Sequence, residues 1–583
     1  MVKTMAVTIQ TLFSPTAGAT ACLVLALLYC VRRVLLPKPI PGIPYNKASA
    51  GRILGDVPDV LAWKAETMEI WSYVRKLAIE LDSPVIQMFM RPYAKPWVIV
   101  NDFREAMDIQ TYRNTDFDRA HFLGDIFKPL LPGNHVWMPT GDQFRANRQL
   151  IRDTMSPFFL YQVAGPGIHS ATQGLLRLWR ERARLAQGHA FEADNDIFRA
   201  TVDVILTATF GFEIGAVVSQ ADILSKTDSI NLSVDMDKPA IFPAIRDPDE
   251  FTSIRTLVDS VEIAMNSPVP RFSLSFALKF HPSLRKARAY KDRMIDERLK
   301  MAWEKFAEGA DRDDRVKCAV DLLVQREVQM ANKEKRAIQY DTLAIRDELF
   351  GFLQAGHETG STTLCWAVKY LTANQNVQQK LRAALKSAHT RAVGAGDMPS
   401  AEEIAKANVP YLDAFIEETH RCGTTSSAVV RVAIRDTTIL GHKVPKGSDI
   451  FLLNNGPSFQ TRPFDIDESS RTATSREAKD KYGVWNPSTI QKFWPERWLV
   501  EEKAGSGEIR FDPYAGPVMA FGTGLRGCFG TKLASLELKI IITLIVWCFE
   551  LQETPTSLSG FGAHDKNTRR PQQVYLKLKE VGI

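Results

Sequence analysis

The chain has 583 residues, of which 45% are hydrophobic, 24% charged and 9% aromatic, a composition typical of a globular protein. Its net charge of +6, from 73 basic and 67 acidic side chains, is too small to indicate a nucleic-acid partner. The seven cysteines form no C-x-x-C pair, which argues against a disulfide framework or a zinc knuckle and favours reduced thiols facing the cytosol.

The N-terminus predicts a membrane anchor. No charged residue occurs from Thr4 to Val31, and Arg32, Arg33 and Lys38 follow. Such a stretch can cross a hydrocarbon core as a single helix, and its positive flank stays in the cytosol. A cleaved signal peptide fits less well, because one A-x-A sequence (17–19) precedes the apolar run and the other (48–50) lies far behind it. We therefore expect an anchor at 1–36, a proline-rich hinge at 37–52 and one folded domain at 53–583.

Beyond the hinge, apolar periodicity predicts a mainly α fold with small β-sheets. The expected helices cover 59–80, 142–156, 169–187, 196–208, 285–308, 341–372, 376–390 and 410–422. The expected strands are short and dispersed, at 85–90, 97–100, 437–440 and 449–453. The stretch 454–493 lacks periodicity and predicts a long irregular segment.

A glycine-rich loop near the C-terminus allows two interpretations. Gly522, Gly524 and Gly527 match the dinucleotide pattern G-x-G-x-x-G. That interpretation needs a strand before the loop and a second strand ending in an acid near Glu550. Pro517 leaves little room for the first strand, and no turn divides the run from 531 to 550 into helix and strand.

The alternative interpretation is a metal thiolate. Phe521, Gly524, Arg526, Cys528 and Gly530 fit F-x-x-G-x-R-x-C-x-G, and a chance match to five fixed positions is improbable. A cysteine at a helix start favours the thiolate, and glycines let backbone N–H groups approach the sulfur. The arginine can pair with a haem propionate, while the phenylalanine can shield the sulfur from water. The alternative, a buried structural cysteine in a glycine turn, would need none of these neighbours.

This loop resembles the cysteine-ligand loop of the cytochromes P450, the haem-thiolate monooxygenases. The sequence "AGHETGSTT" (355–363) resembles the oxygen-activation motif of that family, with Gly360 where Thr or Ser is usual. There Ala355 and Gly356 would form an oxygen groove, with the helix loosened at the glycine. Glu358 and Thr359 would form an acid–alcohol pair that passes protons.

Further motifs of the family follow in order. Glu418 and Arg421 match its E-x-x-R helix, and Arg497 in "FWPERW" resembles the arginine that completes a structural Glu-Arg-Arg network. Two more arginines resemble propionate ligands: Arg431, which follows Val430 instead of the usual proline, and Arg148, which follows Phe144 at the position of the tryptophan in W-x-x-x-R.

The resemblance implies the cytochrome P450 fold and a haem b whose axial ligand is Cys528, with Arg526, Phe521, Gly530, Arg431 and Arg148 around it. It also implies electrons from NADPH through a membrane-bound reductase, and a single-pass position in the endoplasmic reticulum membrane with the catalytic domain in the cytosol. Oxygen would enter a lipophilic substrate as a hydroxyl or epoxide. The sequence of residues 115–144 resembles membrane-bound enzymes of filamentous fungi, which would place the reaction in secondary-metabolite biosynthesis.

Two sets of residues carry finer expectations. Arg145, Arg152 and Lys532 could form the reductase dock. Candidate pocket segments are 117–128 (with Phe117, His121, Phe122 and Phe127), Phe350–Leu353, 424–429 and the turn around Phe561, where the alternative is ordinary core packing. Two other functions stay open. One is a haem-thiolate isomerase or dehydratase that uses no oxygen, and the other is a non-catalytic haem-binding membrane protein.

Overall fold

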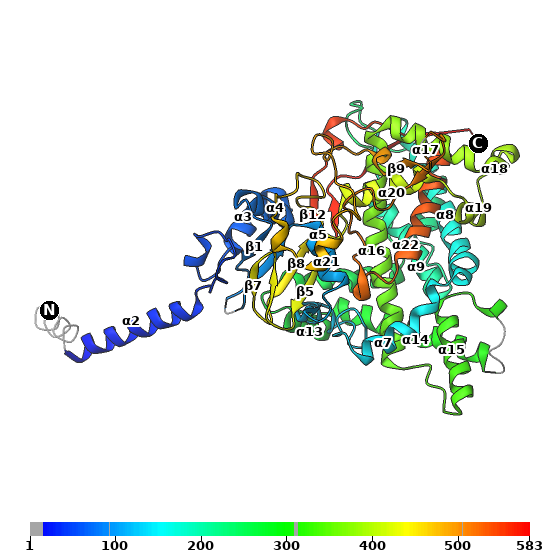
Figure 1. Cartoon of the computed structure of the whole chain (residues 1–583). Helices are drawn as coiled ribbons and strands as arrows, with labels where there is room; N and C mark the ends of the chain where they lie inside the picture. Colours follow the sequence, from blue (N-terminus) through cyan, green and yellow to red (C-terminus); the bar gives the residue numbers. More distant parts are fainter. Residues whose placement is uncertain (1–14, 93, 308–312, 504, 583) are drawn as a thin grey trace, which may run out of the picture.

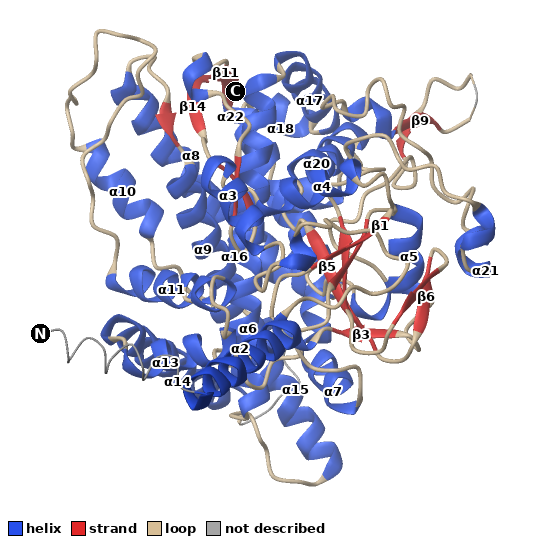
Figure 2. Ribbon diagram, turned by 90° about the vertical axis from the view of Figure 1, so that its left-hand side faces the viewer, coloured by secondary structure: helices blue, strands red, loops and turns tan. Residues whose placement is uncertain are grey.

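The computed structural model describes residues 15–92, 94–307, 313–503 and 505–582. Its fold is mainly helical with small β-sheets, as the sequence predicts (Figure 2). The helices are α2 (Pro15–Leu35), α3 (Val57–Thr67), α4 (Ile70–Glu80), α5 (Phe103–Thr111), α6 (His121–Phe127), α7 (Asp142–Ile151), α8 (Gly165–Ala186), α9 (Asp194–Phe210), α10 (Ala216–Ser225), α11 (Asp249–Asp259), α12 (Val261–Met265), α13 (Pro270–Phe280), α14 (Pro282–Phe306), α15 (Ala319–Glu334), α16 (Leu343–Ala373), α17 (Gln375–Ala388), α18 (Thr390–Ala395), α19 (Ala401–Lys406), α20 (Pro410–Gly423), α21 (Ala473–Glu477) and α22 (Thr531–Cys548).

The main sheet has five strands in the order β1-β2-β8-β5-β3, in which only β2 and β8 run parallel. The strands are β1 (Val85–Met88), β2 (Trp97–Val100), β3 (Phe117–Arg119), β4 (Phe191–Glu192), β5 (Ala428–Ala433), β6 (Thr437–Ile439), β7 (His442–Val444), β8 (Asp449–Leu453), β9 (Leu499–Glu501), β10 (Ile509–Phe511), β11 (Phe549–Gln552), β12 (Ala563–Asp565), β13 (Arg569–Pro571) and β14 (Tyr575–Glu580). A doubly wound parallel sheet, which a dinucleotide-binding loop requires, is not formed by the described residues.

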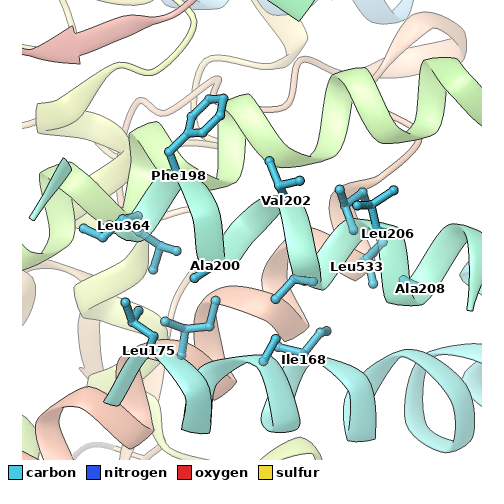
Figure 3. Packing of buried hydrophobic residues seen from close by; sticks show 14 of the residues in the cluster. Ile168, Leu175, Phe198, Ala200, Val202, Leu206, Ala208, Leu364 and Leu533 are labelled. Atoms are coloured by element: carbon cyan, nitrogen blue, oxygen red, sulfur yellow. The ribbon is translucent and has the colours of Figure 1, made fainter. Parts of the chain in front are cut away.

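The centre of the molecule is the long helix α16, which crosses the helical part of Figure 1. Thr342 caps its start by accepting a hydrogen bond from the Ile345 N–H at 3.2 Å. Its apolar side chains pack against α9, and Figure 3 shows Leu364 of α16 in the same cluster as Phe198 and Val202 of α9. Helices α8 and α22 close the same core, so α16 and the start of α22 are held in fixed positions.

The helix predicted at 59–80 is two helices. Met68 ends α3 in the left-handed conformation (φ 64°), and its N–H bonds to the Lys64 carbonyl. The Met68 carbonyl accepts the Asp565 N–H at 3.0 Å, and the Asp565 carboxylate accepts the Trp71 N–H at 2.8 Å. Asp565, at the end of β12 near the C-terminus, therefore fixes the break between α3 and α4. The local sequence pattern could not predict this break.

The N-terminal helix α2 extends away from the body of the molecule, with exposed apolar side chains such as Leu23 and Leu25 (Figure 1). Within the part of the chain that the structure describes, no helix combines the length and the apolar character needed to cross a bilayer. Residues 4–14 of the uncharged stretch lie outside the described residues. The predicted transmembrane helix is therefore not confirmed.

The proline-rich segment after α2 is docked against the folded domain. Gln87 of β1 accepts the Ile40 N–H at 2.8 Å and donates to the carbonyls of Ile40 and Ile43 at 2.9 and 2.7 Å. The Gln87 N–H also bonds to the Pro44 carbonyl at 2.9 Å. Buried hydrogen bonds thus hold the first half of the predicted hinge (37–52) to the main sheet, and its role as a hinge stays a prediction.

The irregular stretch 454–493 packs against α5. Arg471 makes two hydrogen bonds, of 2.7 and 3.1 Å, to the buried carboxylate of Asp102, which also caps α5. Thr472 and Thr474 donate to Asp108 at 2.8 and 2.5 Å. The described part of this segment is thus fixed by charged and polar contacts rather than by regular secondary structure.

Candidate functional site

Cys528 lies between a short 3-10 turn (Gly524–Arg526) and the first residue of α22, Thr531. Its N–H donates to the Phe521 carbonyl at 2.8 Å, which closes the loop, and its thiol is exposed. The loop thus places Cys528 at the N-terminus of α22, and both ends of the loop are fixed.

The loop needs glycines because its backbone packs very closely against α5. Gly522 and Gly524 have φ of 60° and 67°, and a Cβ on Gly524 would lie 2.2 Å from the Gln110 carbonyl. Gln110 also accepts the Thr523 N–H at 3.2 Å and donates to the Ala106 carbonyl at 3.1 Å. The sequence analysis missed Gln110, because a buried polar residue on a separate helix belongs to no contiguous motif.

The pKa of Cys528 is set by the atoms around its sulfur. The side chain is exposed, but the protein atoms packed around the sulfur raise the pKa of the thiol by desolvation, while the Gly530 and Thr531 N–H groups, the Thr531 hydroxyl and the charge of Arg148 lower it by less. The helix start alone therefore does not stabilise the thiolate, and coordination to a cationic metal would have to supply the rest.

Three arginines gather beside this loop. Arg119 of β3 lies opposite Arg431 of β5 in the antiparallel register, and Arg526 comes from the loop itself. Burial, with a smaller contribution from neighbouring arginines, lowers the pKa of Arg119 to about 10 and those of Arg431 and Arg526 to about 9. The Arg119 Nε, the Arg431 Nη2 and two nitrogens of Arg526 are buried without a partner among the described residues.

The neighbouring carboxylate does not satisfy these cations. Asp118 accepts the N–H and the hydroxyl of Thr140 at 2.9 and 2.5 Å, and these bonds lower the pKa of Asp118 although burial opposes them. Unpartnered buried guanidinium N–H groups require an anion, and carboxylates fit them bidentately. The two propionates of a haem supply this chemistry, so the residues present fit that group. The sequence analysis missed Arg119, which only the strand register places here.

Arg148 has a different environment from the other three arginines. Its guanidinium lies 3.5 Å from the Gly527 carbonyl and 4.9 Å from the ring centroid of Phe529, the residue after Cys528. Phe144, four residues earlier on α7, lies closer to Arg526, whose guanidinium carbon is 3.8 Å from the ring centroid, than to Arg148, at 5.9 Å. Arg148 thus contacts the cysteine loop, and its role as a propionate ligand stays a prediction.

On α16, Thr359 and Ala355 are exposed on one face, and the Thr359 hydroxyl donates to the Ala355 carbonyl at 2.7 Å. Helix α16 continues through Gly356 from Leu343 to Ala373, and the oxygen groove at Ala355 and Gly356 stays a prediction. Gly356 is required for another reason: a Cβ there would lie 2.5 Å from Ile205 of α9.

Glu358 is held by the turn between β12 and β13. Its carboxylate accepts the Asn567 amide at 2.5 Å and the Thr568 hydroxyl at 3.4 Å, and burial raises its pKa. The C-terminal segment that reaches the acid–alcohol pair is therefore 567–568. The Phe561 ring packs on the core residues Trp366 and Tyr370 (centroids 6.5 and 5.5 Å apart), which favours the alternative of ordinary packing at this position.

Other expected pocket residues also belong to the core. Phe117, Phe350 and Leu353 are almost fully buried in hydrophobic clusters. Phe122 packs against Trp97 and Phe451 with ring centroids 6.1 and 6.2 Å apart. The alternative of ordinary packing holds for these side chains.

The structure brings Glu418, Arg421 and Arg497 together. The Glu418 carboxylate is fully buried and lies 2.7 Å from Arg421 and 3.0 Å from Arg497. Arg421 donates to the carbonyls of Phe459 and Ile490 at 2.7 Å, so α20 holds the irregular segment in place. The hydrogen bond with Glu418 raises the pKa of Arg421, although burial alone would lower it. Removing one partner would leave a buried charge unpaired and lower the free energy of unfolding by about 3–5 kcal/mol.

Comparison with known proteins agrees with this geometry. The profile of the family Cytochrome P450 matches residues 59–456 and 485–567. The chain is 47% identical over 566 residues to cytochrome P450 monooxygenase GME11363 of Pestalotiopsis microspora, covering 97% of this chain and 98% of the relative. It is 35% identical to cytochrome P450 monooxygenase TRI13 of Fusarium sporotrichioides (96% and 99% covered) and 33% identical to xilC of Penicillium rubens (95% and 95%).

The chain therefore belongs to the cytochrome P450 family. It is an oxidoreductase of the monooxygenase type, and its cofactor is a haem b with a cysteine thiolate ligand. Its electrons come from a redox partner, and the resemblance found in the sequence is confirmed.

The buried carboxyl of Glu537, between α16 and α22, makes the stability of the protein depend on pH. Glu537 lies against Gly360, one of its oxygens has no partner among the described residues, and burial raises its pKa from 4.5 to about 8. Below pH 4.5 both the folded and the unfolded chain keep this proton. Between pH 4.5 and 8 only the unfolded chain loses it, so the free energy of unfolding falls as the pH rises, by at most ~1.4 kcal/mol per pH unit.

Substituting Glu537→Gln removes this dependence. We expect the variant to gain thermal stability relative to the wild type at pH 7.5 and to gain less at pH 5.5, as measured by the Tm of the haem-loaded protein. Glu553→Gln, at an exposed position, is the control. Equal pH dependence of Tm in the Glu537 variant and the wild type would show that this carboxyl is not buried as described.

Proposed function

We propose that this chain inserts one atom of dioxygen into a lipophilic small molecule, with Cys528 as the axial ligand of its haem. The observation that carries the proposal is the exposed Cys528 thiol beside three arginines whose buried N–H groups lack partners. Arg119, Arg431 and Arg526 would hold the propionates, and Phe521 would cover the sulfur.

When bound, the haem supplies the redox chemistry, which its thiolate ligand tunes toward cleavage of the O–O bond. The protein's residues position the substrate and control protons. Ala355 and Thr359 share an exposed face of α16, where oxygen and substrate would meet. The Thr359 hydroxyl, bonded to the Ala355 carbonyl at 2.7 Å, can pass a proton across this face.

Glu358 is suited to supply that proton. It precedes Thr359 on α16, and Asn567 and Thr568 fix its carboxylate. Its raised pKa keeps a larger fraction of the acid protonated near neutral pH than an exposed glutamate would.

The reductase partnership and the membrane position are part of the same proposal. Arg145, Arg152 and Lys532 are exposed near the cysteine loop. Arg145 and Arg152 already pair with Asp142 and Asp153, so Lys532 is the freer cation of this candidate dock for an NADPH-dependent reductase. Residues 1–36 would anchor the chain in the endoplasmic reticulum membrane with the folded domain in the cytosol, which the exposed apolar face of α2 supports.

We place the reaction in fungal secondary-metabolite biosynthesis, which the similarity to TRI13 and xilC supports. A second function, rearrangement or dehydration by a haem-thiolate enzyme without oxygen, needs no acid–alcohol pair. Because Asn567 fixes Glu358 next to Thr359, we favour the monooxygenase over this second function.

The first test concerns the ligand. We expect the dithionite-reduced protein to show a far red-shifted Soret band with carbon monoxide, and Cys528→Ala to lose it, because only a thiolate ligand gives that band. Cys548→Ala, at a buried cysteine in the core, is the matched control and should keep it. A band that persists in Cys528→Ala would refute the assignment of the ligand.

The second test concerns proton delivery. In Thr359→Ala we expect product formation to fall on the order of 100-fold and hydrogen peroxide per NADPH consumed to rise, because the hydroxyl that passes the proton is gone. Thr372→Ala removes a hydroxyl with the same type of bond, to Val368 at 2.9 Å, farther along α16 and should change neither. Unchanged coupling in Thr359→Ala would exclude the relay, and product formation without NADPH or oxygen would favour the second function.

The third test concerns the anchor. Expressed in yeast, the full chain should stay in the membrane pellet after alkaline carbonate extraction, and a chain starting at residue 37 should move largely to the supernatant, because its uncharged stretch is gone. Release of the full chain by carbonate would contradict a membrane-spanning anchor.

A further inference from the structure

Helix α7 lacks a hydrogen-bond donor at position 144, where the family motif has a tryptophan. The tryptophan of W-x-x-x-R would carry an indole N–H, but Phe144 stands at that position and has no polar atom. Its buried ring instead serves as the aromatic surface under Arg526. Any donor toward this place must therefore come from another residue.

His135 lies beside Phe144 in space, although it precedes it by nine residues in sequence. Its ring centroid is 6.0 Å from that of Phe144 and 6.3 Å from that of Phe529, the neighbour of Cys528. Arg148 lies over the same Phe529 ring at 4.9 Å. His135 and Arg148 thus approach the cysteine loop from the same side.

A buried carboxylate fixes the orientation of His135. Glu348 of α16 is 1% exposed and accepts the His135 backbone N–H at 2.7 Å, while its other oxygen lies 2.7 Å from the His135 Nδ1. The amides of Asn134 and Asn147 donate to the same carboxylate at 3.1 and 2.8 Å. A glutamate held by four hydrogen bonds is a rigid support, comparable to the carboxylates that orient histidines in metal sites.

This arrangement leaves one polar atom of the ring for another partner. The Nδ1 bonds to Glu348, and no hydrogen bond from the Nε2 to a described residue is found. As the imidazolium, the ring donates from both nitrogens. A second carboxylate at the Nε2 would give the cation two anionic partners, which stabilises both contacts.

We propose that His135, oriented by Glu348, is a further positioning residue of this enzyme: it anchors a haem propionate and supplies the N–H donor that Phe144 lacks. The inference rests on the proposed function, in which the haem lies between the Cys528 loop and α16. It assigns a role to a histidine and a glutamate that belong to none of the motifs found in the sequence.

The experiment uses the full-length haem-loaded protein and three variants: His135→Leu, Phe144→Trp and the double variant. The readouts are the rate of haem transfer to excess apomyoglobin, the reduction potential of the iron, and the Tm. Removing a second-sphere donor of this kind should speed haem loss by about 10- to 100-fold. The potential should fall in His135→Leu, because an imidazole beside a propionate can carry a positive charge and a leucine cannot.

Rescue separates the proposal from general damage. Phe144→Trp alone should change the rate of haem loss little, but in the His135→Leu background it should restore most of the retention, since it returns an N–H donor. It should not restore the potential, because indole is neutral. His189→Leu, at another buried histidine bonded to the Lys238 carbonyl at 3.0 Å, should leave haem loss and potential unchanged.

Two outcomes overturn the proposal: wild-type haem loss and potential in His135→Leu, or faster loss that Phe144→Trp does not repair. Either leaves the proposed function intact if the red-shifted band with carbon monoxide persists and still depends on Cys528. Absence of that band in the wild type would instead refute the proposed function itself.

Discussion

The burial of three guanidinium groups around the Cys528 loop is the constraint on which the site depends. Arg119 and Arg431 face each other across two strands, a pairing of like charges that is unfavourable by itself. The nearby Asp118 is already satisfied by Thr140. Since buried cations are tolerated only with partners, the fold is complete only when an anion is bound between these arginines. Haem binding and stability are therefore coupled in this protein.

The same loop depends on distant elements that hold it in place. Gln110 of α5 bonds to Thr523, and α5 is in turn fixed by Arg471 and the threonines after it, which bind Asp102 and Asp108. These contacts come from 457–484, the stretch between the two segments that match the family. This stretch thus supports the helix against which the cysteine loop packs.

The sequence predicted what contiguous patterns encode. The long helices, several strands and the E-x-x-R contact of Glu418 with Arg421 follow from spacing along one element. Arg119 and Gln110 were missed, because strand register and close helix–loop packing bring them to the site from separate parts of the chain. The break at Met68 was missed for the same reason, since residues near 565 impose it.

Phe144 shows how a departure from a family motif can be compensated. A tryptophan serves two separable purposes, a ring face for packing and an N–H at its edge. Here the ring face remains, because the Phe144 centroid lies 3.8 Å from the guanidinium carbon of Arg526. The donor can come from any residue that reaches the same space, and the rigid pair of His135 and Glu348 lies within ring contact. The chemistry that the space around the cofactor requires can therefore be supplied from more than one position in the chain.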